Sequence, residues 1–271
     1  GPSRNGMVSG MYSQKYGMQI NADLKFAQVP AQHKTLPETM REAGYRTALV
    51  GKWHVCRDAN VVFDEVYDRI DISSNYFPDS TGVYDGPRLP ILAVKESTYE
   101  NEYMTDKLTS HAIQFMNKQS NATPFFLYLG YNAVHNPWQA EKKYYDRLSN
   151  IKDEYMRVQA SLIACADENI GILLNYLENR KLIDNTIIVF VSDNGPAKGG
   201  PELKTWEGYD PSFEYVFGQM KTLRGHKVDL YEGGIRTPMI IAYKPLLREG
   251  KVFRDMISTL DFYPTICEMT G

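Results

Sequence analysis

Short apolar runs alternate with amphipathic helical stretches along this chain, and the alternation limits its possible folds more than any other feature. Strands joined by helices of that length form a mostly parallel sheet with helices on both faces. We therefore expect an α/β fold. The predicted strands cover 45–51, 124–130, 185–192 and 237–243, and the predicted helices cover 36–44, 102–119, 154–181 and 258–269.

Two of these helices have clear signals. Thr35 is a suitable N-cap for the helix at 36–44, and Gly44 can end it in a left-handed conformation. The helix at 154–181 has a row of apolar residues on one face, namely Ile163, Ile170, Leu173, Leu174 and Leu177.

Residues 58–97, after the first strand, are rich in Asp, Tyr, Gly and Pro, which predicts a long excursion over the surface.

Composition limits the classes of partner. With 43% apolar and 12% aromatic residues, the 271-residue chain can bury a large core in one large domain or two small ones. Its net charge of -3 gives no reason to expect nucleic acid or an anionic membrane as a partner. The longest apolar stretches, such as 186–191, are far shorter than the roughly 20 residues that span a bilayer. Cys56, Cys165 and Cys267 lack zinc-site spacing, and we expect the last two to be buried.

Polar motifs follow the predicted strands, where open α/β sheets hold their binding sites. Lys52 and His54 come directly after the strand at 45–51, and residues two apart at a strand end project to the same side. Lysine supplies a fixed cation, and histidine supplies a proton carrier near neutral pH. From these residues alone, an exposed lysine beside a structurally hydrogen-bonded histidine is the more common outcome.

Two motifs follow later strands. The sequence Ser-Asp-Asn-Gly at 192–195 can form a tight turn, or Asp193 and Asn194 can offer oxygen ligands to Ca²⁺ or Mg²⁺. His135 lies in a proline-containing loop after the strand at 124–130, where it is either a turn histidine or a functional one.

The last motif contains two adjacent glycines. Lys227 precedes Glu232-Gly233-Gly234, and the glycines let the backbone pass close to a ligand or to another segment. Arg236 is expected to pair internally with a carboxylate, as part of a packed turn.

The beginning of the chain carries a further motif. Pro2-Ser3-Arg4, followed by Ser9-Gly10, resembles the signature C/S-x-P-S-R-x-x-x-x-T/S-G of type I sulfatases, in the alkaline-phosphatase-like superfamily. Other parts are similar to further sulfatase motifs and follow in the family's order: Gly-Lys-Trp-His at 51–54, the His135 loop, the helix and strand at 166–186, and residues 232–238. The resemblance covers 1–271 and implies one sulfatase catalytic domain with a mostly parallel central sheet.

The resemblance also implies a partial domain, truncated at both ends. In the signature, the Cys or Ser that becomes formylglycine stands two places before the proline, so we expect it immediately before Gly1. The strand with the family's metal-binding aspartates and the smaller C-terminal subdomain are expected outside 1–271, and the fragment alone is expected to be inactive. Residues 58–100 match no sulfatase motif and are expected to carry substrate specificity.

Residue by residue, the resemblance implies a sulfate-binding set. Asp193 and Asn194 would hold the divalent cation, Ca²⁺ or Mg²⁺, together with the upstream aspartates. Arg4 would hold the oxygen of the nucleophile, while Lys52 and Lys227 would neutralise the sulfate oxygens.

The two histidines would serve opposite proton transfers. His135 would protonate the leaving alcohol, and His54 would take a proton from the hydrated formylglycine so that sulfate leaves. We expect Lys52, His54, His135 and Lys227 to converge on one pocket.

The expected function is hydrolysis of a sulfate ester of a carbohydrate or an aryl alcohol. A formylglycine-generating enzyme would act during maturation, and the resemblance implies a secreted, periplasmic or lysosomal protein. Tyr76, Tyr84, Trp138 and Trp206 lie in predicted loops, where aromatic rings can stack on a sugar. Two alternatives stay open, a phosphodiesterase or phosphonate hydrolase of the same superfamily and a non-catalytic sulfatase-like binding protein. The paired lysines and histidines favour sulfate.

Overall fold

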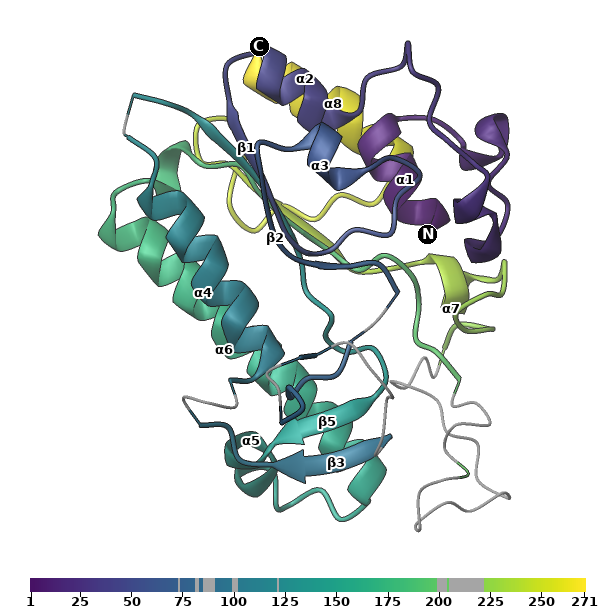
Figure 1. Cartoon of the computed structure of the whole chain (residues 1–271), viewed down its shortest axis with the longest axis vertical. Coiled ribbons are helices and arrows are strands. Elements are labelled where there is room, and N and C mark those ends of the chain that lie inside the picture. The colour runs from purple at the N-terminus through teal and green to yellow at the C-terminus, as the bar shows by residue number, and fades with distance from the viewer. Residues whose placement is uncertain are drawn as a thin grey trace. The chain divides into compact units, whose positions relative to one another are not determined.

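A computed structural model describes residues 1–72, 74–80, 83–84, 91–98, 102–120, 122–198, 204 and 222–271 (Figure 1). The chain divides into two compact units. Unit 1 comprises Gly1–Ser73, Asp106–Asn132 and Phe253–Gly271, and unit 2 comprises Ser74–Thr105 and Ala133–Val252.

Unit 1 is built on a parallel sheet of three strands in the order β2-β1-β4. The middle strand, β1 (Arg46–Lys52), is the most buried of the three, and Ala48, Leu49 and Val50 in it are fully buried. Figure 1 shows α4 on one side of this sheet and α1, α2 and α8 on the other, as expected for an α/β fold. The other elements of this unit are α1 (Pro2–Ser9), η1 (Ser13–Tyr16), η2 (Asn21–Lys25), α2 (Leu36–Glu42), α3 (Ala59–Val62), β2 (Glu65–Ile70), α4 (Met104–Asn117, in this unit from Asp106), β4 (Phe125–Gly130), η5 (Thr259–Asp261) and α8 (Phe262–Thr270).

Helix α2 begins and ends where its caps predict. The backbone N–H of Thr35 donates to Glu38 Oε2 at 2.8 Å as part of a capping box, and the Thr35 hydroxyl donates to the same oxygen at 2.7 Å. Beyond the last helical residue, Gly44 has φ 90°, the left-handed conformation that ends many helices.

Unit 2 combines a long helix with two small sheets. Helix α6 (Glu154–Asn179) packs against the parallel pair β3 (Leu92–Lys95) and β5 (Trp138–Glu141). Strands β6 (Ile188–Val191) and β7 (Met239–Ala242) pair antiparallel, whereas the other strand pairs of the described residues are parallel. The remaining elements of this unit are α5 (Lys142–Arg147), η3 (Ile183–Asn185) and α7 (Glu232–Ile235).

Three sequence-based expectations about local structure need correction. Residues 58–97 are not only a surface excursion, because they include α3 and β2 and pair with β1. Ile163 does not lie on the buried face of α6, since it is 56% exposed. Cys165 is buried as expected, but Cys267 is only partly buried.

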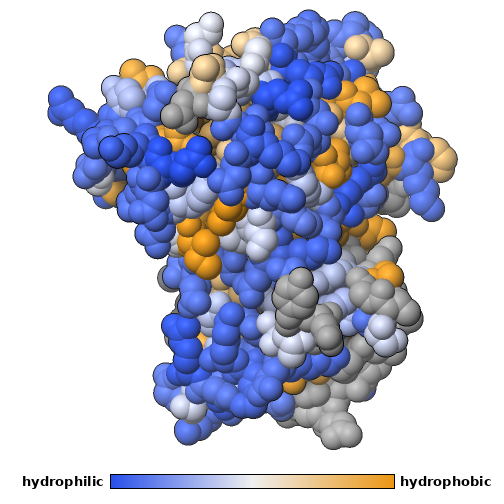
Figure 2. Space-filling view, turned by 60° about the vertical axis from the view of Figure 1, so that its left-hand side comes forward, coloured by the Kyte–Doolittle hydropathy of each residue, from blue (hydrophilic) through white to orange (hydrophobic). Residues whose placement is uncertain are grey.

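The surface is mixed in character. On the face drawn in Figure 2, hydrophilic residues predominate and hydrophobic ones lie scattered among them. Within the part of the chain that the structure describes, no helix combines the length and the apolar composition needed to cross a membrane.

Candidate active-site residues

Arg4 lies in the first turn of α1, inside unit 1. Pro2 occupies the first helical position, where its missing N–H costs nothing, and Gly10 ends the helix with φ 63°. The Arg4 side chain is buried, with 6% of the residue exposed, and its Nη2 lies 3.1 Å from His54 Nδ1. The fold thus brings together two predicted catalytic residues that are 50 positions apart.

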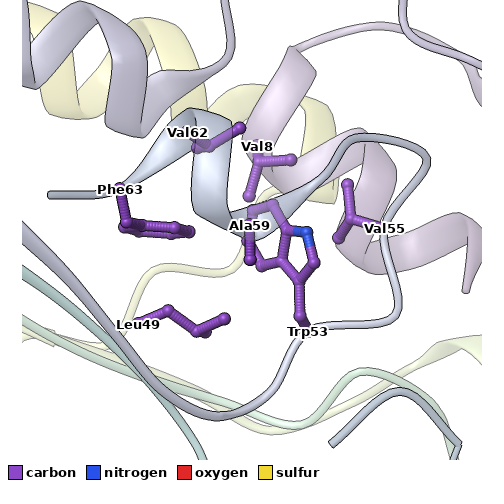
Figure 3. Packing of buried hydrophobic residues seen from close by; sticks show 7 residues of the cluster. All are labelled: Val8, Leu49, Trp53, Val55, Ala59, Val62 and Phe63. Carbon is purple, nitrogen blue, oxygen red and sulfur yellow. The ribbon is translucent and has the colours of Figure 1, made fainter. Parts of the chain in front are cut away.

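The segment that carries Lys52 and His54 is anchored by the tryptophan between them. Trp53 is fully buried, and its Nε1 donates to the carbonyl oxygen of Arg57 at 2.6 Å. Its ring makes edge contacts with Phe63 and Tyr128, with centroids 5.0 and 5.3 Å apart. Figure 3 shows the apolar cluster around it, which comprises Val8, Leu49, Trp53, Val55, Ala59, Val62 and Phe63.

His54 has an unusual backbone and an unusual side-chain environment. Its φ is 50°, in the left-handed region that non-glycine residues seldom occupy, and such positions are enriched at functional sites. Burial lowers the pKa of His54 to about 3. The positive charges of Arg4 and Lys52 act in the same direction, while Asp71 acts against them. His54 is therefore a neutral imidazole near pH 7.

His135 lies in unit 2, in the loop between β4 and β5. The hydroxyl of Tyr76 donates to the carbonyl oxygen of His135 at 3.1 Å. His135 Nδ1 lies 2.9 Å from the carbonyl oxygen of Asn136. Because a carbonyl only accepts, Nδ1 carries a hydrogen, and in the neutral ring Nε2 carries the lone pair.

Asp193 and Asn194 follow β6 in unit 2, at the end of the strand where the sequence predicts them. Ser192 Oγ donates to the carbonyl oxygen of Asn194 at 3.0 Å, and Asn194 Nδ2 donates to that of Gly195 at 2.8 Å. Both side chains are half-buried. A carboxylate beside an amide oxygen is the donor chemistry that Ca²⁺ and Mg²⁺ prefer, so this pair fits either ion.

Lys227 is held beside this loop by the backbone. Its N–H donates to the carbonyl oxygen of Pro196 at 2.6 Å, two residues beyond Asn194. The Gly195 N–H donates to the carbonyl oxygen of Gly234 at 2.8 Å. The proposed metal-binding pair and a proposed sulfate-binding lysine thus belong to neighbouring segments of one unit.

The glycines of the Glu-Gly-Gly motif serve the close approach that the sequence predicts. A Cβ atom at Gly233 would lie within 3.0 Å of the carbonyl oxygens of Arg224 and Gly225, so the backbone packs there without room for a side chain. Arg236 Nη1 pairs with Glu232 Oε2 at 3.1 Å, which confirms the expected ion pair within this turn.

The candidate residues form separate groups in the two units. Unit 1 holds Arg4, Lys52 and His54, and unit 2 holds Asp193, Asn194 and Lys227 as well as His135. Convergence of Lys52, His54, His135 and Lys227 on one pocket stays a prediction.

Two of the aromatic residues expected to stack on a sugar do not have that role. Tyr76 is fully buried, and Trp138 is 1% exposed inside β5 rather than in a loop, so neither ring offers a free face. Tyr84 is half-buried, and its hydroxyl donates to the carbonyl oxygen of Glu102 at 2.6 Å. Trp206 lies outside the described residues.

Sequence reasoning missed two features of these groups. It did not predict α1, although a proline at position 2 and a glycine at position 10 are ordinary signals for the two ends of a helix. It also gave Tyr76 a role on the surface, whereas this residue supports the loop of His135 from inside.

The sequence and the fold of this chain are similar to those of known proteins. The chain matches the Sulfatase family over residues 1–271. Arylsulfatase J of Mus musculus is 30% identical, over 99% of this chain and 44% of its own length. N-acetylgalactosamine-6-sulfatase of Homo sapiens is 26% identical, over 100% of this chain and 52% of its own length. The crystal structure of Ps i-CgsB in complex with k-i-k-neocarrahexaose is 29% identical with a TM-score of 0.80, over 100% of this chain and 61% of that one.

Proposed function

Because the chain belongs to the sulfatase family, with the fold of the alkaline-phosphatase-like superfamily, we propose that the whole protein hydrolyses a sulfate ester. The observation that carries this proposal is the family match over the full 271 residues. This chain spans about half the length of the curated relatives it matches, so the proposal concerns the protein that contains it.

Two groups would complete the site. A divalent cation, Ca²⁺ or Mg²⁺, held by Asp193 and Asn194 would supply Lewis acidity, and a formylglycine at the motif position before Gly1 would supply the nucleophile. The support for the cation is the donor chemistry of these two side chains and the hydrogen bonds that hold their loop. A formylglycine-generating enzyme would be needed during maturation.

The residues of this chain bind sulfate and move protons. Lys52 and Lys227 neutralise the oxygens of the sulfate group, each as a compact cation. Arg4 orients the side chain of the nucleophile. His135 delivers the Nε2 proton of its imidazolium form to the oxygen of the leaving alcohol and becomes a neutral ring that keeps its hydrogen on Nδ1, where it faces the carbonyl of Asn136. His54 accepts the proton whose removal allows sulfate to leave.

A sulfated carbohydrate is the favoured substrate class. Ps i-CgsB was crystallised with k-i-k-neocarrahexaose, and the human relative is named for a sulfated sugar. These names support a glycan for this protein, and an aryl sulfate is the simpler test substrate. The sequence-based expectation of a secreted, periplasmic or lysosomal setting stays a proposal.

The experiment is a sulfate-release assay on the full-length protein matured with its formylglycine-generating enzyme. We expect inorganic sulfate from a sulfated oligosaccharide or an aryl sulfate, and about a 10²–10³-fold lower kcat/KM for Lys227→Ala. Lys244→Ala is the matched control, since Lys244 is an exposed lysine of the same unit that pairs only at the surface with Asp184. Faster cleavage of phosphate diesters than of sulfate esters would overturn the assignment, and so would a Lys227→Ala variant with full activity.

A further inference from the structure

The contact between Arg4 and His54 determines which ring nitrogen of His54 carries hydrogen. Arg4 Nη2 lies 3.1 Å from His54 Nδ1, and both residues belong to unit 1. A guanidinium has only N–H donors and stays protonated in proteins. His54 Nδ1 must therefore accept, and a neutral His54 ring must carry its hydrogen on Nε2.

We propose that Arg4 is a positioning residue that holds His54 as a neutral Nε2–H tautomer and makes Nδ1 the atom that accepts a proton during turnover. The catalytic part of this inference rests on the proposed sulfatase function, whereas the tautomer itself does not. When His54 takes a proton, the hydrogen moves from the donor hydroxyl to Nδ1, and the ring becomes an imidazolium with hydrogen on both nitrogens. Arg4 must first turn its N–H away from Nδ1, so the guanidinium controls when the lone pair is free.

The surroundings hold both partners of this contact in place. Arg4 is buried on α1, and its neighbour Asn5 is fully buried there too. Asn5 Oδ1 accepts the backbone N–H of Cys56 at 2.9 Å, which ties α1 to the segment just after His54. On the other side of His54, Trp53 is locked in the apolar cluster of Figure 3. These contacts fix the backbone on both sides of His54.

The charges around His54 also favour the neutral ring. Burial is the largest cause of the lowered pKa of His54, and the cationic side chains of Arg4 and Lys52 lower it further. Asp71 is the one acidic group that acts on it among the described residues, and its effect is the smallest. Nδ1 of His54 thus carries no proton at neutral pH, and its lone pair faces the N–H of Arg4.

Unit 1 contains a histidine with the opposite arrangement, which serves as an internal control. His111 Nδ1 is hydrogen-bonded to Asp68 Oδ2. A carboxylate accepts, so His111 must carry hydrogen on Nδ1. The two rings therefore differ in which nitrogen bears the hydrogen.

The test is a long-range ¹H–¹⁵N spectrum of the full-length protein with labelled histidine. His54→Gln and His111→Gln assign the two rings, because each removes one set of signals. We expect His54 at pH 7 to show an unprotonated Nδ1 and a protonated Nε2, while His111 shows a protonated Nδ1. A His54 ring with hydrogen on Nδ1, or one that is doubly protonated at pH 7, overturns the proposal whether or not the protein is a sulfatase.

Two variants of Arg4 then test the cause. In Arg4→Met the cation and the donor are lost, so His54 should titrate at a higher pH, and the acidic limb of the pH profile of kcat should move upward with it. Arg4→Lys restores the charge and should return part of that shift. If Arg4→Met leaves both the tautomer and the titration of His54 unchanged, Arg4 does not position this ring. The wild-type spectrum decides the tautomer even if Arg4→Met does not fold.

Discussion

Gly195 and Gly233 pack backbone against backbone in unit 2. A Cβ atom at Gly195 would lie closer than 3.0 Å to both the carbonyl carbon and the carbonyl oxygen of Gly233. The Gly195 N–H donates to the carbonyl oxygen of Gly234 at 2.8 Å. The loop that carries Asp193 and Asn194 therefore reaches its place only because residue 195 has no side chain.

Gly195→Ala should destabilise unit 2 and weaken binding of a divalent ion. A methyl group pressed against a carbonyl forces the two segments apart, and overpacking of this kind costs about 1–3 kcal/mol in the free energy of unfolding. Urea denaturation measures the stability, and calorimetric titration of the full-length protein with Ca²⁺ measures the affinity.

The matched control is Gly171→Ala. Gly171 lies in the interior of α6, and a Cβ atom there would meet nothing within 4 Å. Because alanine is the better helix former, this variant should be more stable by about 0.5–1 kcal/mol. Equal stability of Gly195→Ala and the wild type would show that the crossing does have room for a side chain at residue 195.

Val228→Gly should stabilise the protein. Val228 has φ 79°, which is an outlier for a β-branched residue, and strain of this kind costs about 1–3 kcal/mol. The side chain is 89% exposed, so its removal loses little burial. Even after the extra chain entropy that glycine brings to the unfolded state, we expect a gain of about 1 kcal/mol by chemical denaturation.

Val252→Gly is the comparison for this prediction. Val252 is 70% exposed in the same unit and has no positive φ, so glycine there should only lower the free energy of unfolding, by about 0.5–1 kcal/mol. If Val228→Gly and Val252→Gly lower the free energy of unfolding by the same amount, the backbone at Val228 is not strained.

The elements whose signals are local could be predicted from sequence. Thr35 and Gly44 delimit α2 because a capping box and a left-handed residue act on the backbone within one turn. Strand β1 was predicted because its apolar run is buried on both faces. The positions of Lys52 and Asp193 at or just after strand ends follow from the same reasoning.

The features that depend on distant contacts could not be predicted in this way. Helix α1 buries polar residues, and Asn5 is satisfied there by the backbone of Cys56, so no apolar period reveals the helix. Trp138 was expected in a loop, but β5 pairs with β3 and the ring is buried. The bond between Arg4 and His54 joins residues 50 positions apart, and only the packing of α1 beside β1 creates it.

Glu38→Ala should destabilise unit 1 strongly. Glu38 is 8% exposed, and besides capping α2 it accepts from Arg57 Nη2 at 2.8 Å. Removing the carboxylate leaves the guanidinium of Arg57 largely buried without this partner, which costs about 3–5 kcal/mol. Glu42→Ala tests the same helix at an exposed ion pair with Lys34 and should cost less than about 1 kcal/mol. Similar losses in the two variants, measured by urea denaturation, would show that burial of the Glu38 carboxylate is unimportant.

The stability of unit 1 should fall as the pH is lowered from about 6.5 toward 3, in part because of His54. Burial lowers the pKa of His54 in the folded state to about 3, whereas the ordinary value near 6.5 applies to the unfolded chain. Between these values the unfolded state binds more protons, so the free energy of unfolding rises with pH across this window and is independent of His54 above it.

Carboxylates add to the slope below about pH 4.5. The informative comparison is therefore the slope between pH 4.5 and 6.5 for the wild type and for His54→Gln, by urea denaturation. His54→Gln should show the smaller slope, by up to one proton, and parallel curves for the two proteins would mean that His54 is not held neutral by the fold.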